Sequence, residues 1–152
     1  MEINHRYNFL YEKQKILELG CNPGAITQFL VENTLSDFRA PNIVSVDKET
    51  MEKVPGSKFI QGNFVNNKIL TEIINYFEYQ NVDLIVSNLT PKLQGDLDRD
   101  QINMMMLNIQ TLFISTKLLE KGGNMIIKTL HGYHEIDIFV KDSKFMKKII
   151  FL

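Results

Sequence analysis

Cysteine is nearly absent from this chain, because Cys21 is the only one among 152 residues. A single thiol excludes an internal disulfide bond and a zinc site built from cysteines. Long apolar runs are also missing, since stretches such as Val82–Val86 and Met125–Ile127 are far too short to span a membrane. Residues 1–7 lack the apolar core of a secretory signal peptide. We therefore expect no membrane contact and an intracellular setting, with cytoplasm, nucleolus and mitochondrion all left open.

An excess of either charge is missing as well, because the formal net charge is −1 at pH 7. Proteins that bind nucleic acid usually carry clustered lysine and arginine, so composition alone does not predict RNA binding. One basic cluster lies near the C-terminus, at Lys141, Lys144, Lys147 and Lys148. This cluster has two interpretations. It is a solvated helix face that is followed by the start of a strand, or it is a basic rim that binds RNA.

A convergent set of metal ligands is missing too. His131 and His134 are three residues apart and Glu135 is adjacent, but the sequence offers no third converging ligand. We interpret these residues as loop polarity and expect no metal.

The length of the chain suits one domain over residues 1–152, with a short N-terminal lead over 1–15 and a core over 16–152. Apolar patterning predicts strands and helices in alternation. The expected strands are 16–19, 42–47, a short one that with its exit loop covers 58–64, 82–87, 124–128 and 146–152. The expected helices are 25–33, 68–79, 100–119 and 133–142. This alternation predicts an α/β fold with a doubly wound, mostly parallel sheet that binds its ligand outside the carboxyl ends of the strands.

Two details of these elements are also predicted. Lys121–Gly123 should end the long helix, because glycine commonly stops helices. Apolar side chains fall largely on one face of the same helix, and we expect that face and the methionines at 104–106 to serve the core. The residues of this face are Ile102, Met105, Met106, Ile109, Leu112, Phe113 and Leu118.

A glycine-containing loop follows the first expected strand, with Gly20 and Gly24 on either side of Pro23. A strand, a glycine loop and a helix in this order let the backbone approach a nucleoside closely. The spacing differs from the dinucleotide pattern G-x-G-x-x-G, which makes a nicotinamide enzyme a poor interpretation. Cys21 in this loop has no evident base partner, so we interpret it as a small loop residue and not as a nucleophile.

Polar side chains end or follow all five of the first predicted strands: Glu18, Asp47, Asn63, Asn88 and Lys128. Parallel strands bring their carboxyl ends to one edge of the sheet, so these side chains could converge on one crevice. A carboxylate at Asp47 could accept hydrogen bonds from both ribose hydroxyls, while Asn63 and the adjacent Phe64 could contact an adenine. Each residue alone could equally cap the helix that follows it.

The motifs together resemble the FtsJ/RrmJ family of RNA ribose 2′-O-methyltransferases. The resemblance covers roughly residues 16–150. It is carried by LGCNPG at 19–24 with Gln28, FIQGNF at 59–64, VDLIVSNLTP at 82–91 with Gly95, and LLEKGGNMIIK at 118–128 with Gly132. It implies a Rossmann-like methyltransferase fold, S-adenosylmethionine as the cofactor and RNA as the substrate. Ribosomal RNA is the first choice of substrate, either free or presented on a ribosomal particle, and transfer RNA is the second. We expect the protein to be a monomer.

The resemblance also implies roles for individual residues. Lys128 would be the central catalytic lysine, which draws the proton from a ribose 2′-hydroxyl while the oxygen attacks the cofactor's methyl group. Asn88 would stand beside it, at the position of the family's catalytic aspartate. Gly24 and Ile26 would line the methionine part of the cofactor. The full cofactor-binding set is Glu18, Gly20, Asn22, Pro23, Gly24, Ala25, Ile26, Asp47, Asn63, Phe64 and Asn88.

The chain departs from the family's lysine–aspartate–lysine–glutamate tetrad at three positions. Asn88 replaces the aspartate, Lys13 and Lys15 are too close to the first strand to replace the first lysine, and the final glutamate would lie beyond residue 152. The last antiparallel strand of such sheets is expected to be missing. Besides an RNA methyltransferase, the sequence leaves open a catalytically impaired module that binds cofactor or RNA, and a small-molecule methyltransferase that shares only the fold.

Overall fold

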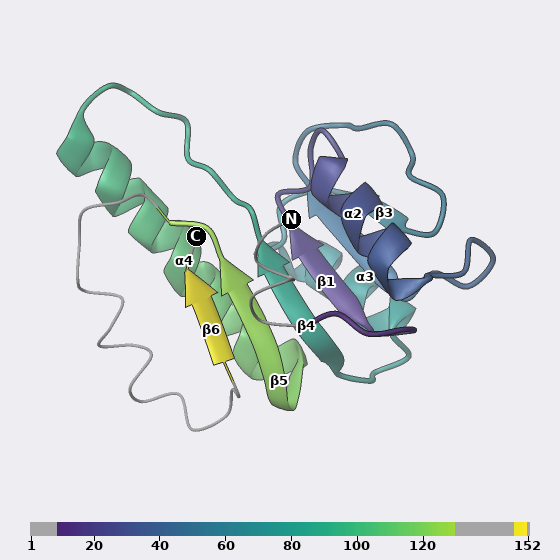
Figure 1. Ribbon diagram of the computed structural model, residues 1–152. Helices are drawn as coiled ribbons and strands as arrows, with labels where there is room; N and C mark the ends of the chain where they lie inside the picture. The colour runs from purple at the N-terminus through teal and green to yellow at the C-terminus, as the bar shows by residue number, and fades with distance from the viewer. Residues whose placement is uncertain (1–8, 130–147, 152) are drawn as a thin grey trace.

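A computed structural model describes residues 9–129 and 148–151, which form one sheet with helices on both sides (Figure 1). The strands are β1 (Ile16–Leu19), β2 (Ile43–Asp47), β3 (Lys58–Gln61), β4 (Val82–Ser87), β5 (Leu119–Ile127) and β6 (Lys148–Phe151). The helices are α2 (Ala25–Thr34), α3 (Asn67–Tyr76) and α4 (Leu97–Leu118). The predicted α/β alternation is confirmed over this part of the chain.

The sheet has the strand order β3-β2-β1-β4-β5-β6, and every pair is parallel. The central strand β1 pairs on both sides, with Leu17 opposite Val44 of β2 and Ile85 of β4. The strand order reverses next to β1, and ligands of doubly wound sheets bind at such a switch point. In the described ranges β6 pairs directly with β5, so no antiparallel strand lies between them, as the sequence predicts.

Alternate residues of the strands enter two separate cores, because both faces of a parallel sheet are covered. One face packs against α3 and α4, with Leu17, Ile85 and Met125 from the strands and Ile73 from α3. The opposite face packs against α2, with Ile16, Ile43, Leu84, Val86 and Ile126 from the strands. Leu30 of α2 and Phe9 complete this second core. The two cores fix the strands and therefore the loops at their carboxyl ends.

The prediction that Lys121–Gly123 ends the long helix is wrong. Helix α4 ends at Leu118 and β5 starts at Leu119, so these residues lie inside the strand. A Cβ atom at residue 123 would lie 3.0 Å from the backbone oxygen of Asp83 and 2.8 Å from the Leu119 side chain. Glycine is needed there because β5 approaches β4 closely, where the pairing shifts register between Val82 and Leu84. At its other end α4 begins at Leu97, three residues before the predicted start, after the N-cap residue Asp96.

The predicted core face of α4 is also wrong in part. Ile102, Met106 and Phe113 are exposed by 56%, 49% and 59%. The buried face instead carries Met104, Asn108, Thr111, Ile114, Ser115 and Leu118. The hydroxyls of Thr111 and Ser115 donate to the backbone oxygens of Leu107 and Leu112, whereas the side-chain amide of Asn108 has no hydrogen-bond partner among the described residues. Apolar periodicity alone therefore predicts the buried face of this helix incorrectly.

Several sequence predictions lie outside the described residues: the helix over 133–142, the residues His131, His134 and Glu135, and the lysines at 141, 144 and 147. Among residues 9–129 and 148–151, no helix has the length and apolar character needed to cross a membrane. The same part of the chain holds no cluster of three potential metal ligands.

Candidate active site

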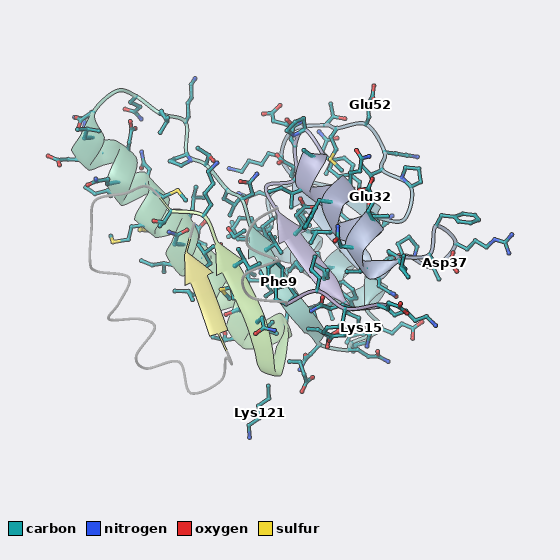
Figure 2. The ribbon with its side chains drawn as sticks, in the orientation of Figure 1. Phe9, Lys15, Glu32, Asp37, Glu52 and Lys121 are labelled. Carbon is teal, nitrogen blue, oxygen red and sulfur yellow. The ribbon has the colours of Figure 1, made fainter. Side chains whose placement is uncertain are left out.

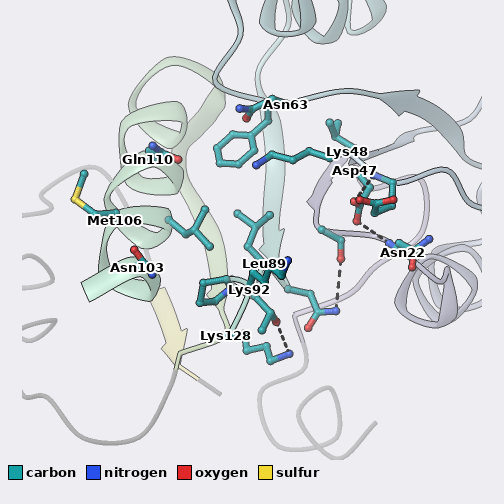
Figure 3. A pocket seen from close by; sticks show the side chains of 18 of the residues that line it. Asn22, Asp47, Lys48, Asn63, Leu89, Lys92, Asn103, Met106, Gln110 and Lys128 are labelled. Carbon is teal, nitrogen blue, oxygen red and sulfur yellow. Dashed lines mark hydrogen bonds between the residues drawn. The ribbon is translucent and has the colours of Figure 1, made fainter. Parts of the chain in front are cut away.

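A cleft of about 730 Å³ lies at the carboxyl ends of the strands. The loops after β1 to β5 each contribute to its lining, and α4 forms another wall (Figure 3). Of the predicted site residues, the cleft contains Gly20, Asn22, Asp47, Asn63, Phe64, Asn88 and Lys128. The sheet topology therefore brings together side chains that are more than one hundred residues apart in sequence.

The floor of the cleft is formed where the loop after β1 meets the loop after β4. Gly20 has φ +78°, and a Cβ atom there would lie 2.9 Å from the backbone nitrogen of Leu89. Only glycine accepts this conformation and this approach without strain. The amide of Asn88 donates to the backbone oxygen of Leu19 at 2.9 Å, which joins the two loops next to Gly20.

Asp47, at the end of β2, is fixed by two backbone amides. One carboxylate oxygen, Oδ2, accepts from the amide of Asn22 at 2.9 Å, and Oδ1 accepts from the amide of Glu49 at 3.0 Å. A carboxylate offers about four lone-pair sites, so about two acceptor sites remain. Asp47 can therefore accept two further hydrogen bonds from a ligand in the cleft.

Asn63 and Phe64 follow β3 and line the neighbouring part of the cleft. Phe64 is buried in the core that α3 covers, so its position is fixed by packing. Asn63 is exposed, and its Oδ1 accepts from the amide of Val65 at 3.3 Å, which leaves its amide NH₂ group for a ligand. This pair offers an apolar ring beside a hydrogen-bond donor.

Lys128, directly after β5, lies on the opposite side of the cleft from the residues after β2 and β3 (Figure 3). Its backbone amide donates to the Ser87 oxygen at 2.8 Å, and its Nζ donates to Thr90 Oγ1 at 2.9 Å. The side-chain amide of Asn88 donates to the Gly20 oxygen at 3.5 Å. Lys128 is therefore oriented by Thr90, a residue that sequence reasoning did not select.

Glu18 is fully buried under the glycine loop and does not line the cleft. Its Oε2 accepts from the hydroxyls of Thr27 at 2.6 Å and Ser45 at 2.7 Å. Its Oε1 has no hydrogen-bond partner among the described residues. Burial raises the pKa of this carboxyl, although the two hydroxyls act against the shift.

Cys21 is also buried, and burial together with the charges of Glu18 and Asp47 raises the pKa of its thiol to about 12. A thiol that stays protonated is a poor nucleophile. This agrees with the interpretation of Cys21 as a structural loop residue.

The remaining predicted residues lie elsewhere. Pro23, Gly24 and Ala25 line a separate cavity of about 580 Å³ beside α2. Ile26 packs against the second core. The structure thus divides the predicted cofactor set between the main cleft, a second cavity and the protein interior.

Sequence reasoning missed the wall that α4 provides and several residues of the intervening loops. These residues are Lys48, Glu49, Gly62, Leu89, Thr90, Pro91, Lys92, Asn103, Met106, Leu107 and Gln110. The loop after Asn88 was adjacent to a selected residue and could have been included. No periodicity signal identifies which residues of α4 lie over the strand ends.

We expect the stability of the protein relative to its Glu18→Gln variant to fall as pH rises above about 4.5. The raised pKa means that the folded state prefers the protonated carboxyl, so this contribution is present below the usual glutamate pKa of 4.5 and is lost at higher pH. Melting temperatures of both proteins between pH 4.5 and 8 measure the trend. A stability difference between the two proteins that stays constant over this pH range would contradict the assignment.

The fold and the cleft define a class: a Rossmann-like α/β protein with a cleft at its switch point. The FtsJ-like methyltransferase family model matches residues 1–150, nearly the whole chain, and the chain belongs to this family. Two curated relatives are both called ribosomal RNA large subunit methyltransferase E. The protein from Legionella pneumophila strain Lens is 30% identical over 143 residues, which cover 94% of this chain and 68% of the relative. The protein from Nitrosopumilus maritimus is 26% identical over 136 residues, which cover 90% and 67%.

Solved structures share the fold. A Plasmodium falciparum protein, provisionally assigned as a ribosomal RNA methyltransferase, matches with a TM-score of 0.79 and 23% identity, covering 92% of this chain and 79% of that one. A short-chain dehydrogenase family protein from Francisella tularensis matches with a TM-score of 0.54 and 15% identity, covering 76% and 50%. At such identities these likenesses show the fold alone, and function has to be argued from the site.

Proposed function

We propose that this chain transfers a methyl group from S-adenosylmethionine to a ribose 2′-hydroxyl of RNA, with ribosomal RNA as the first candidate. The observation that carries the proposal is that Asp47 and Lys128 line one cleft from opposite sides. Asp47 can hold the ribose of the cofactor, and Lys128 as a neutral amine can take the proton of the target hydroxyl. Membership of the family and the printed activity of the curated relatives support the same reaction.

The residues of the cleft fit the cofactor. Asp47 keeps acceptor sites for two ribose hydroxyls, while Asn63 offers an amide donor for an adenine beside the largely buried ring of Phe64. Gly20 has no side chain where the loops after β1 and β4 meet, so the backbone there is accessible to a ligand. When bound, the cofactor supplies a methyl group that is activated by its sulfonium centre.

Lys128, in its neutral amine form, would accept the proton of the target hydroxyl at Nζ and become an ammonium. A ribose hydroxyl is a weak nucleophile near pH 7, so proton removal in the transition state accelerates its attack. Thr90 Oγ1 now accepts a hydrogen bond from Nζ and would keep the amine aimed into the cleft. Holding the oxygen, the methyl carbon and the sulfur in line supplies the rest of the rate enhancement.

The test is transfer of a radioactive methyl group from S-adenosylmethionine to ribosomal RNA by the purified chain. The expected product is a 2′-O-methylated nucleotide, which makes the adjacent phosphodiester resistant to alkali. Methylation of a base, or no transfer by a folded chain that binds both RNA and cofactor, would refute the proposal.

A second candidate is a module that binds cofactor or RNA without turnover, and the specific observation in its favour is Asn88. Its neutral amide donates to the Gly20 oxygen at 3.5 Å and carries no charge to balance Lys128. The third interpretation, a small-molecule enzyme, requires a closed apolar pocket, whereas charged side chains such as Asp47, Lys92 and Lys128 line this cleft.

Comparison of Asn88→Asp with the unchanged protein separates the first two candidates. Under the proposed function, we expect the unchanged protein to methylate RNA at a rate within about tenfold of the variant, because removal of the proton depends on Lys128. Asn103→Asp places the same new charge on the α4 side of the cleft and serves as a matched control. If both proteins bind S-adenosylmethionine and only Asn88→Asp methylates, the chain acts as a binding module.

A further inference from the structure

The charged side chains of the cleft form two groups on different loops. Asp47, Lys48 and Glu49 follow β2 in direct succession, so one lysine is accompanied by two acids. Lys92 in the loop after β4 and Lys128 after β5 form the other group. Among the described residues of the loops after β4 and β5, no acidic side chain lines the cleft, whereas these two lysines do.

Neither lysine of the second group is neutralised by a described carboxylate. The salt bridge found in the described residues joins Arg99 and Asp96 and lies outside the cleft. Lys128 Nζ is held by the neutral hydroxyl of Thr90, and Lys92 is exposed. The ammonium group of Lys92 is therefore available to an anionic ligand, whereas Lys128 has to be a neutral amine when it takes the proton of the target hydroxyl.

The loop after β4 places Lys92 close to the proposed catalytic amine. Thr90, which bonds Lys128 Nζ at 2.9 Å, is only two residues from Lys92. Two residues of extended chain span at most about 7 Å between Cα atoms. Pro91 lies between them and fixes its own φ angle, which restricts this short segment. Figure 3 shows the side chains of Lys92 and Lys128 in the same part of the cleft.

We propose that Lys92 binds a phosphodiester of the RNA next to the ribose presented to Lys128. This inference rests on the proposed function and adds the residue that would hold the substrate. Every internal ribose of RNA is flanked by phosphodiesters, and a lysine ammonium binds phosphate as a point charge. Lys48 is less suited to this role, because Asp47 and Glu49 offset its charge.

The test measures RNA binding without requiring turnover. A fluorescein-labelled single-stranded oligoribonucleotide is titrated with the unchanged chain and with Lys92→Gln at several salt concentrations, and anisotropy reports binding. Loss of one phosphate contact should reduce the slope of log affinity against log salt by about 0.7. Equivalently, the unchanged protein should lose about threefold more affinity than the variant when salt is raised fourfold. Lys92→Arg should keep the slope of the unchanged protein.

Two controls and one kinetic readout make the result specific. Lys121→Gln removes an exposed lysine at the opposite end of β5 and should leave the slope unchanged (Figure 2). Affinity for S-adenosylmethionine, measured by calorimetry, should be the same for Lys92→Gln and the unchanged chain. In methyl transfer, Lys92→Gln should raise KM for ribosomal RNA and leave kcat nearly unchanged.

The outcomes separate this proposal from the proposed function. An unchanged slope for Lys92→Gln, while the unchanged chain methylates RNA, overturns the role of Lys92 alone. A reduced slope in a chain that transfers no methyl group supports Lys92 as an RNA contact and refutes the enzyme. A lower kcat with unaltered slope and KM also overturns the phosphate contact.

Discussion

Lys128→Ala is expected to lower kcat for methyl transfer by about 100- to 10,000-fold, the usual contribution of a general base. Affinity for S-adenosylmethionine should change little, since the hydrogen bond that Lys128 Nζ makes among the described residues goes to Thr90 and not to the residues of the cofactor side. The backbone amide of residue 128 still donates to the Ser87 oxygen, so β5 should remain paired with β4. Single-turnover rates at saturating cofactor and RNA measure the effect.

A matched control for this prediction lies at the other end of the same strand. Lys121→Ala removes an exposed lysine at the start of β5 and should leave kcat unaltered. Lys128→Arg tests the role of the proton, because a guanidinium keeps its charge and does not act as a base. If Lys128→Arg keeps most of the activity, Lys128 acts only as a cation and the proton must leave by another route.

Asp47→Ala should weaken S-adenosylmethionine binding by about 100-fold or more. Two hydrogen bonds from ribose hydroxyls to a charged acceptor contribute about 1.5 kcal/mol each at the low end, and each 1.4 kcal/mol corresponds to a tenfold change. The substitution also releases the amides of Asn22 and Glu49, which would loosen the loops after β1 and β2. Isothermal titration calorimetry with the cofactor measures the loss.

Asp37→Ala is the control for the local turn. Asp37 accepts a hydrogen bond from the amide of Arg39, two residues on, as Asp47 does from Glu49. Both substitutions therefore remove the same kind of turn contact, but Asp37 does not line the cleft. Equal losses of cofactor affinity in the two variants, or no loss in Asp47→Ala, would contradict the assignment of the ribose site.

Much of the fold follows from local patterns in the sequence. The ranges 16–19 and 82–87 were predicted as strands and have those bounds in the structure, because buried apolar runs with clear ends form the centre of the sheet. The junction of α4 and β5 could not be predicted in this way. Gly123 looks like a helix stop, but it serves the close approach of β5 to Asp83, which depends on tertiary pairing.

The residues of the candidate site could likewise be predicted only in part. Strand-end polarity selected Asp47, Asn63, Asn88 and Lys128, since parallel strands bring these positions to one edge. It also selected Glu18, whose side chain is buried below the loop between two hydroxyls. The direction in which a strand-end side chain points, into the cleft or into the core, depends on packing that a single sequence does not show.

The contribution of α4 depended even more on tertiary structure. Met106 belongs to an apolar pattern that predicts burial, yet it lies half exposed at the cleft, and the buried stripe contains Asn108 and Thr111. The helix is rotated from the orientation that its apolar residues would favour by themselves. Nothing in the local pattern reveals such a rotation, because it results from the fit of α4 against β4 and β5.

The contact between Gly20 and Leu89 has a consequence for how the protein can diverge. Neither loop can change its path alone, because a side chain at residue 20 would collide with backbone and not with a movable group. The amide of Asn88 ties the same place to Leu19. Mutations that remodel the loop after β4 near Leu89 are thus constrained by the loop after β1, and the reverse also holds. Lys92 and the α4 residues of the cleft lie outside this junction, so substitutions there would change the lining of the cleft more readily.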